Sequence, residues 1–249
     1  MTVEESDVRF AARIDTEAGE LLVALQKNGD LEGKALGAEG DRIANAFLCR
    51  SLRELRPDDA VLSEEEKDGK ERLSAKRVWI VDPLDGTREY GEGRNDWAVH
   101  VALAIDGIAT VGAVALPSLG LTLSSGNPVE PSPANKPLKM LVSRTRPAAE
   151  AVAVAEALGA ELVPMGSAGA KAMAVVRGEA DIYLHTGGQY EWDNCAPVAV
   201  AQASGLHVSR ANGDPLRYNN ANTYLPDLLI CREEIAQQVL GLARPLLAG

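Results

Sequence analysis

Apolar residues at the start of the chain recur with a helical period. They do so from Val8 to Gln26 and again from about Asp41 to Leu55, with polar residues on the opposite face, which predicts two amphipathic helices. The segment from Asn28 to Gly40 between them contains four glycines, and this composition predicts a mobile loop. The first part of the chain is therefore expected to form a helix, a loop and a second helix.

Short apolar runs in the next part of the chain predict β-strands. Asp106 and Gly107 separate two of these runs, and because both residues accept positive φ angles, they predict a tight hairpin turn. The acidic stretch between residues 63 and 76 is typical of a solvated loop. The predicted strands are residues 60–62, 78–81, 97–104, 108–116 and 119–124.

The pattern changes in segment 126–138. This segment is rich in proline and small polar residues, which cannot form a core, so it predicts a linker. Beyond it, strand and helix patterns alternate, which is typical of an α/β fold. The predicted strands are 139–142, 162–163, 182–184 and 228–231, and the predicted helices are 147–158, 168–177, 195–204 and 233–246. We therefore expect an N-terminal α+β subdomain (1–125), a linker (126–138) and a C-terminal α/β subdomain (139–249).

Composition and charge narrow the class of protein. The formal net charge is -11, whereas binding of a nucleic-acid polymer needs a basic face. Cys49, Cys195 and Cys231 are scattered and form no CxxC pair, which favours reduced thiols over a disulfide framework or a zinc site. The chain shows no apolar signal segment and no run of about 18 apolar residues. We expect a soluble cytoplasmic protein, with no nucleic-acid polymer and no membrane as a partner.

The densest group of chemically active residues follows the second predicted strand, in the N-terminal subdomain. Asp82 and Asp85 are separated by only two residues, and two acids this close repel each other unless a cation lies between them. Hard carboxylate oxygens favour a divalent metal such as Mg²⁺. Gly86 and Thr87 come next, at the start of a short helical turn where backbone N–H groups can hold a phosphate. The segment therefore predicts phosphoryl chemistry at a metal site.

Two other acidic segments could contribute to the same site. Glu64 is the first of three glutamates after a predicted strand, so it could reach the Asp82 and Asp85 pair, although acidic triplets usually lie in solvated loops. Asp193 stands near the start of a predicted helix, where it could bind a cation or cap the helix. The residues alone leave both choices open.

The segment from Gly166 to Lys171 also permits two interpretations. It could be a turn that holds a phosphate at a helix start, or its small residues could pack a helix closely against a sheet. The GxxxxGK[ST] spacing of a P-loop is absent. The histidines, His100, His185 and His207, show no metal-binding spacing and are predicted to be structural.

A rival interpretation of the central motif is a phosphatase of the haloacid-dehalogenase type. There an Asp-x-Asp-Gly-Thr segment follows a strand and supplies an aspartate nucleophile. Here the spacing from Asp82 to Asp85 is one residue longer, Pro83 bends the segment, and the motif lies after two predicted helices. These departures disfavour an aspartyl-phosphate mechanism.

Three ordered motifs resemble the inositol monophosphatase superfamily of lithium-sensitive, Mg²⁺-dependent phosphatases. They are Trp79 to Tyr90, Trp192 to Pro197 and Gly213 to Asn219. Within the superfamily, the Gly-Thr-Arg-Glu-Tyr and Trp-Asp-x-Cys-Ala-Pro segments look like the 3′(2′),5′-bisphosphate nucleotidase, or CysQ-like, branch. The resemblance implies an α/β fold of the layered αβαβα sandwich type, with the active site between its two parts.

The resemblance also implies roles for individual residues. Thr87, supported by Asp41, would position and deprotonate a metal-activated water for direct in-line attack, and Glu64 would be a further catalytic residue. Two or three Mg²⁺ ions would be held by Glu64, Asp82, Leu84 through its carbonyl, Asp85 and Asp193. The implied substrate contacts are Asp85, Gly86, Thr87, Arg88, Lys171 and Asp193.

The implied reaction is removal of the 3′-phosphate of 3′-phosphoadenosine 5′-phosphate, or of its 5′-phosphosulfate analogue, in sulfur assimilation. Inositol monophosphatase or fructose-1,6-bisphosphatase activity stays open, because the metal site recognises the phosphate group and only the residues at the rim of the site recognise the leaving group. A non-catalytic sensor of Mg²⁺ and nucleotide is an alternative of another class. The expected partner is a small phosphorylated nucleotide, and a homodimer is left open.

Overall fold

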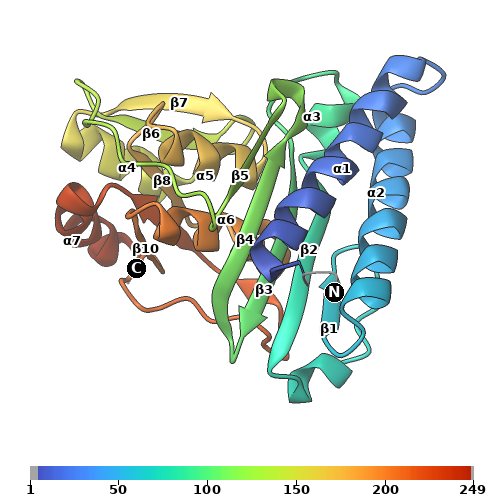
Figure 1. The fold of residues 1–249 in the computed structure, drawn as a ribbon. Coiled ribbons are helices and arrows are strands. Elements are labelled where there is room, and N and C mark those ends of the chain that lie inside the picture. The colour runs from blue at the N-terminus through green and yellow to red at the C-terminus, as the bar shows by residue number, and fades with distance from the viewer. Residues whose placement is uncertain (1–4, 248–249) are drawn as a thin grey trace.

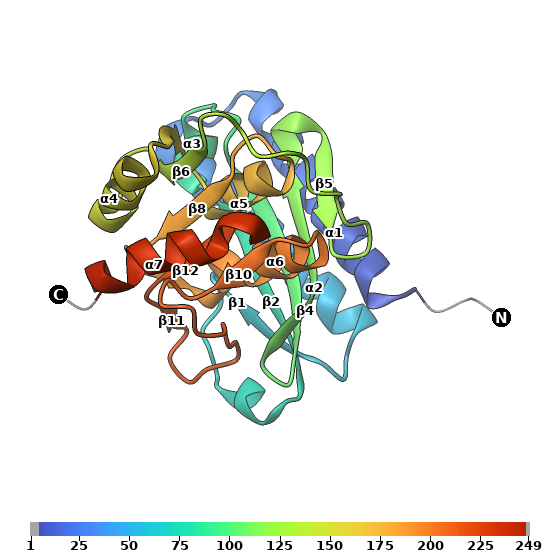
Figure 2. The ribbon, with the colours of Figure 1, turned by 90° about the vertical axis from the view of Figure 1, so that its left-hand side faces the viewer.

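The computed structural model describes residues 5–247 and stacks helices and sheets in five layers. In Figure 1, α1 (Asp7–Asn28) and α2 (Gly33–Leu55) form the right-hand layer, followed by a sheet, a central pair of helices and a second sheet. The left-hand layer consists of α4 (Ala149–Leu158) and α7 (Ala236–Leu247), which face the viewer in Figure 2. The predicted α/β fold class and αβαβα sandwich are confirmed.

The first sheet is built from the N-terminal half of the chain. Its strands lie in chain order, and they are β1 (Ala60–Ser63), β2 (Arg77–Asp85), β3 (Ala98–Ile105), β4 (Ile108–Leu116) and β5 (Leu121–Ser124). β1 is parallel to β2, and the other neighbours are antiparallel. The apolar faces of α1 and α2 cover one side of this sheet, where Phe10 and Leu48 share a buried cluster with Trp79.

The second sheet has the order β10-β12-β8-β6-β7, and its strands come from the C-terminal half. They are β6 (Lys139–Ser143), β7 (Glu161–Met165), β8 (Ile182–His185), β10 (His207–Ser209) and β12 (Leu228–Cys231). Between the two sheets lie α5 (Ala168–Val176) and α6 (Glu191–Ala203), whose small side chains join residues of both sheets in one core cluster. The outer face of the second sheet packs against α4 and α7.

The predicted mobile loop from Asn28 to Gly40 is wrong over most of its length. Only residues 29–32 separate α1 from α2, so Gly37 and Gly40 lie inside a helix. A Cβ atom on Gly37 would come within 2.7 Å of Thr87 Cγ2, and one on Gly40 within 2.9 Å of Tyr90 Cε1. These glycines allow α2 to pack closely against α3 (Thr87–Gly91).

Helix α6 begins at Glu191, before the predicted start at Cys195. Pro197 therefore lies inside the helix, where it removes one backbone N–H donor. A capping box closes the first turn, in which the backbone N–H of Tyr190 donates to Asp193 Oδ2 at 2.5 Å. Asp193 is thus fixed within the first helical turn.

The predicted hairpin turn between β3 and β4 is confirmed. Asp106 and Gly107 have φ angles of 50° and 77°, which these residue types accept. Three short strands were not predicted, because two or three residues give too little apolar periodicity; they are β9 (Gln189–Tyr190), β10 and β11 (Tyr224–Leu225).

Residues 128–138 contain no helix or strand, as expected of the proline-rich segment. The segment is tied to the C-terminal half, since the backbone N–H of Asn135 donates to Asp181 at 3.0 Å and its side-chain amide donates to the Gly178 carbonyl at 3.3 Å. The helices of the central layer pack on both sheets. The subdomain division at 126–138 therefore stays a prediction.

Cys49, Cys195 and Cys231 are buried free thiols. Burial raises the pKa of Cys49 to about 12, so this thiol stays protonated at neutral pH. Within residues 5–247, no helix is both long enough and apolar enough to span a bilayer.

The side chain of Asp15 is fully buried in α1 and has an unusual environment for an acid. Neither carboxyl oxygen has a hydrogen-bond partner among the described residues, although the backbone of Ala115 lies nearby. Burial raises the pKa of Asp15 well above its usual value. Above about pH 4 the unfolded chain loses this proton while the folded protein keeps it. Stability therefore falls as the pH rises from there toward the folded-state pKa.

We expect Asp15→Asn to raise Tm at pH 7 by more than about 2 °C, because the amide mimics the protonated acid and removes this pH-dependent cost. The gain should be smaller at pH 4, as thermal unfolding at both pH values would show. Asp30→Asn, at an exposed position, is the matched control and should change Tm at neither pH. A lower Tm for Asp15→Asn at pH 7, or an equal gain at both pH values, would contradict this account.

Candidate active site

Asp82 and Asp85 lie at the end of β2, where its pairing with β3 is irregular. Asp82 pairs with His100, and three positions later Asp85 pairs with Ala98, so two residues of β2 lie opposite one of β3. In a regular strand, residues three apart point to opposite faces, but the additional residue of this bulge lets both carboxylates face the same side. The backbone N–H of Leu84 donates to Asp82 Oδ1 at 3.0 Å and holds the bulge in place.

The structure brings the predicted acidic residues together. Carboxylate oxygens of Asp82, Asp85 and Asp193 lie within 4.8 Å of one another. Asp193 comes from α6 in the C-terminal half, so the cluster is shared by the two halves of the chain. Glu64 follows β1, and its backbone N–H donates to the Val81 carbonyl at 3.3 Å, with its side chain beside the same cluster. Their role as metal ligands stays a prediction.

Burial and mutual repulsion perturb three of these carboxyl groups. Burial and the charge of Asp193 raise the pKa of Glu64 to about 7, although part of this side chain is open to solvent. Burial and the charges of Glu64 and Asp85 raise the pKa of Asp82 well above its usual value. Burial and Asp85 raise that of Asp193 to about 6. The cluster thus resists full ionisation unless a cation offsets the charge.

Asp85 differs from its neighbours because it has hydrogen-bond donors of its own. Its Oδ2 accepts the Ser167 hydroxyl at 2.5 Å and the Gly169 N–H at 2.6 Å, and His100 Nε2 lies 3.3 Å away. Burial opposes ionisation, but the contacts with His100, Ser167 and Gly169 outweigh it and lower the pKa of Asp85 to about 2. Asp85 is therefore an ionised, fixed carboxylate.

Sequence reasoning missed the three residues that hold Asp85. Ser167 also accepts the N–H of Ala170 at 2.9 Å and so caps α5, a role that a serine before a helix could have indicated. His100 carries no comparable signal; its Nδ1 lies 3.0 Å from the Trp192 carbonyl. A Cβ atom on Gly169 would lie 2.0 Å from His100 Nε2, so the 166–171 segment is closely packed. This agrees with the interpretation that its small residues pack a helix closely against a sheet.

Thr87 and Asp41 lie together beside the acidic cluster. Gly86, with a φ angle of 90°, turns the chain from β2 into α3, so that Thr87 begins the helix. The Thr87 hydroxyl donates to the Leu84 carbonyl at 3.1 Å and also contacts the Asp41 carboxyl. Burial and the charge of Glu65 raise the pKa of Asp41 to about 7. A carboxyl group with such a pKa is suited to accept a proton at neutral pH.

The two cationic residues predicted to bind substrate have other partners in the structure. Arg88 is exposed and forms an ion pair with Glu92 at 2.8 Å. Lys171 is buried, and its Nζ donates to the carbonyls of Gly166 and Ser167, the latter at 2.7 Å. Burial lowers the pKa of Lys171 to about 8. The contacts of Arg88 and Lys171 with substrate stay predictions.

The donor set of the cluster fits a divalent metal ion. Glu64, Asp82, Asp85 and Asp193 offer carboxylate oxygens, and the Leu84 carbonyl keeps a lone pair beside its bond to Thr87. Hard cations such as Mg²⁺ prefer oxygen donors of this kind. Four acids in a largely buried site would otherwise be strongly unfavourable when ionised.

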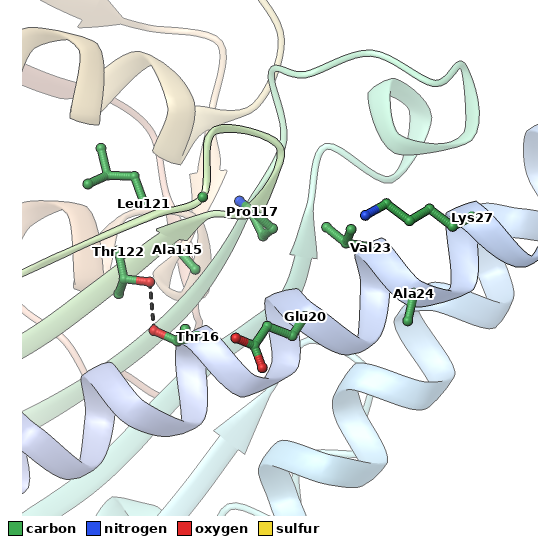
Figure 3. Close-up of a pocket in the computed structure, with 10 residues that line it drawn as sticks. Thr16, Glu20, Val23, Ala24, Lys27, Ala115, Pro117, Leu121 and Thr122 are labelled. Carbon is green, nitrogen blue, oxygen red and sulfur yellow. Dashed lines mark hydrogen bonds between the residues drawn. The ribbon is translucent and has the colours of Figure 1, made fainter.

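Two cavities can be compared with this site. One of about 680 Å³ lies between α2 and α3 and is lined by Asp41, Thr87 and Arg88. Another of about 470 Å³ lies between α1 and the turn before β5 (Figure 3), where the hydroxyl groups of Thr16 and Thr122 are 2.7 Å apart. The second cavity contains none of the predicted site residues, so only the first is relevant to the chemistry.

The layered αβαβα fold, with a cluster of carboxylates that could bind a metal ion, fits a metal-dependent phosphatase. The chain belongs to the inositol monophosphatase family, whose sequence model matches residues 4–244. The family predicted from the three ordered motifs is thereby confirmed.

Relatives within the family support the predicted CysQ-like branch. The 3′-phosphoadenosine 5′-phosphate phosphatase of Mycobacterium leprae is 48% identical over 256 residues, which cover 97% of this chain and 94% of the relative. The 3′(2′),5′-bisphosphate nucleotidase CysQ of Escherichia coli K12 is 32% identical over 74% of this chain and 80% of its own length. The predicted branch is confirmed.

Solved structures share the fold at lower sequence identity. CysQ from Bacteroides thetaiotaomicron superimposes with a TM-score of 0.79 at 23% identity, covering 91% of this chain and 97% of that chain. Inositol monophosphatase II from Staphylococcus aureus gives a TM-score of 0.81 at 20% identity, covering 95% of each chain. The sandwich architecture is therefore common to both groups.

Proposed function

We propose that the protein is a Mg²⁺-dependent phosphatase that removes the 3′-phosphate of 3′-phosphoadenosine 5′-phosphate, giving AMP and phosphate. The observation that carries this proposal is the 48% identity, over 97% of the chain, to a Mycobacterium leprae protein named for that activity. The 5′-phosphosulfate analogue carries the same 3′-phosphate and is proposed as a second substrate. Buried free thiols support a cytoplasmic location.

The proposed metal site holds two or three Mg²⁺ ions between the two halves of the chain. When bound, the ions activate water and offset the charge on the phosphoryl oxygens. The all-oxygen donor set supports Mg²⁺ over softer metals. The proposed ligands are Glu64, Asp82, Asp85, Asp193 and the Leu84 carbonyl.

The chain's own residues would bind the phosphate and handle the proton. The backbone N–H groups of Gly86 and Thr87 hold phosphate oxygens at the start of α3. The Thr87 hydroxyl and the Asp41 carboxylate hold the attacking water, and Asp41 takes its proton. The water oxygen forms the new P–O bond while the bond from phosphorus to the ribose 3′-oxygen breaks. That oxygen then acquires a proton from a solvent water. Asp41 releases its proton to the hydroxide left behind, which completes hydrolysis and restores the carboxylate.

The rim of the site near Asp193 carries aromatic side chains that suit a purine base. Tyr190 stacks on Trp192, with ring centroids 4.9 Å apart and an interplanar angle of 9°, and Tyr224 packs edge-on against Tyr190 at 6.0 Å. Tyr190 and Tyr224 each remain 46% exposed, so aromatic surface is free for stacking. In-line attack puts the leaving nucleoside on the side of the phosphorus opposite the attacking water. These features favour a nucleotide over a sugar phosphate.

The proposed substrate can be tested by comparing kcat/KM for 3′-phosphoadenosine 5′-phosphate and for inositol 1-phosphate at the same Mg²⁺ concentration. We expect a higher value for the nucleotide, because base stacking lowers its KM. In the same assay, Tyr190→Ala should lower kcat/KM for the nucleotide about 10-fold and leave that for inositol 1-phosphate unchanged.

Tyr190→Phe is the matched control, since it keeps the aromatic face, and it should retain activity with both substrates. A wild-type preference for inositol 1-phosphate would overturn the nucleotidase proposal. Equal losses on both substrates in Tyr190→Ala would instead mean that Tyr190 supports the first turn of α6 and does not bind the base.

A further inference from the structure

The acidic cluster is assembled from two halves of the chain, and the carboxylates that each half contributes repel those of the other. Asp82, Asp85 and the loop with Glu64 belong to the first half, whereas Asp193 begins a helix of the second. Ionised carboxylates this close repel one another, so contacts outside the cluster help to hold Asp193 beside Asp82 and Asp85. Segment 217–220 provides such contacts; it begins inside the Gly213 to Asn219 motif, to which the proposed reaction assigns no role.

On the side of the first half, this segment is bonded to the loop that follows Glu64. Arg72 is almost fully buried, and its guanidinium donates to Asn219 Oδ1 at 2.8 Å and to the Asn220 carbonyl at 3.0 Å. Asn219 Nδ2 donates back to the Arg72 carbonyl at 2.9 Å. The same guanidinium makes two bonds to Asp68, at 3.0 and 2.7 Å, and so closes the loop between Glu64 and Arg72.

On the side of the second half, the segment is bonded to the start of α6. Glu191 is fully buried and accepts the backbone N–H groups of Asn219 at 2.7 Å and Asn220 at 2.8 Å. Asn220 Nδ2 adds a third bond at 2.8 Å. Tyr218 donates its hydroxyl to Asn194 Oδ1 at 2.8 Å, so residues on both sides of Asp193 are held.

The backbone of Asn219 is adapted to this bridging position. Its φ angle is 61°, in the left-handed region that asparagine tolerates better than most residues. This conformation is compatible with simultaneous bonding of its backbone N–H to Glu191 and of its side chain to Arg72. Arg72, Asn219 and Glu191 thus form one continuous hydrogen-bonded clamp from the Glu64 loop to the helix of Asp193.

We propose that this Arg72–Asn219–Glu191 clamp positions Glu64 and Asp193 for shared metal binding across the two halves. None of the three residues is a proposed ligand, so they are positioning residues that act through their neighbours. Groups that orient metal ligands typically change metal affinity when they are removed. The inference rests on the proposed metal site and adds to it a fixed geometry before the metal binds.

The test is Asn219→Gly in the full chain. Glycine accepts the left-handed backbone, so the substitution removes only the side-chain bonds, which go to Arg72 and, at 3.4 Å, to the Ala75 carbonyl. We expect about 10-fold weaker Mg²⁺ binding by calorimetry, and a matching rise in the Mg²⁺ concentration needed to raise Tm. At saturating Mg²⁺, kcat should be largely retained, because the ligands themselves are intact. Glu191→Gln is nearly isosteric and should also weaken Mg²⁺ binding. If Asn219→Gly does not fold, the Mg²⁺ affinity of Glu191→Gln tests the proposal instead.

Arg210→Gln is the matched control, because it breaks a comparable ion pair, at 2.7 Å to Asp227, that has no bond to the clamp. It should lower Tm without changing Mg²⁺ affinity. The proposal is overturned if Asn219→Gly and Glu191→Gln lower Tm but bind Mg²⁺ as the wild type does. Absence of Mg²⁺ binding by the wild type would overturn the metal site itself, and with it the clamp, which is a distinguishable result.

Discussion

Asp82→Asn should abolish measurable Mg²⁺ binding, lower kcat by about 10²–10³-fold or more, and yet raise the Tm of the metal-free protein. The amide keeps the Oδ1 acceptor for the Leu84 N–H, so the bulge that presents it is preserved. It removes a buried acid whose pKa is raised by burial and by the charges of Glu64 and Asp85. Activity assays, Mg²⁺ calorimetry and thermal unfolding in a chelator would measure the three effects.

The gain in metal-free Tm and the loss of Mg²⁺ binding have one cause. The repulsion between carboxylates that destabilises the metal-free fold is the same repulsion that favours binding of a cation. Asp59→Asn is the control, because that carboxylate is also buried but is bonded to Arg77 at 2.7 Å and to Trp79 at 2.8 Å. It should lower Tm and leave Mg²⁺ binding intact. Near-normal activity of Asp82→Asn would refute the metal site as drawn, and a lowered metal-free Tm would refute the repulsion argument.

The fold was predictable wherever a residue's role depends on its near neighbours in the chain. The helical period of α1 and the Asp106-Gly107 turn are local signals, and both were confirmed. The glycines of α2 were misread because glycine suits a loop as well as a close contact. Only the distant Thr87 and Tyr90, which pack against Gly37 and Gly40, decide between these two roles.

The candidate site follows the same division between local and distant signals. The close spacing of Asp82 and Asp85 implied a cation without any knowledge of the fold. The placement of Asp193 beside them depends on the packing of two halves; its position near a helix start left cation binding and capping equally open, and only its motif favoured cation binding. His100 carried no signal at all, since a single histidine in a strand gains meaning only from the carboxylate 3.3 Å away. Long-range pairing of polar groups is therefore what the sequence left undetermined.

Thr87→Val should lower kcat by about 10²-fold or more while leaving Mg²⁺ binding within the wild-type range. Valine keeps the methyl group that packs against Gly37 and removes only the hydroxyl, which lies between the Leu84 carbonyl and Asp41. Without it, the attacking water loses one of its two positioning groups, so the loss should fall on kcat and spare KM. Steady-state kinetics and Mg²⁺ calorimetry on the same preparation would measure both.

Thr87→Ser gives the reciprocal change, since it keeps the hydroxyl and removes the methyl group, and it should restore most of kcat. Asp41→Asn should lower kcat as far as Thr87→Val does, and the double variant should lose little more than either one, because the two residues act on the same water. If Thr87→Val instead weakened Mg²⁺ binding in proportion to its loss of rate, the hydroxyl would be acting through the Leu84 carbonyl. The attacking water would then need a different partner.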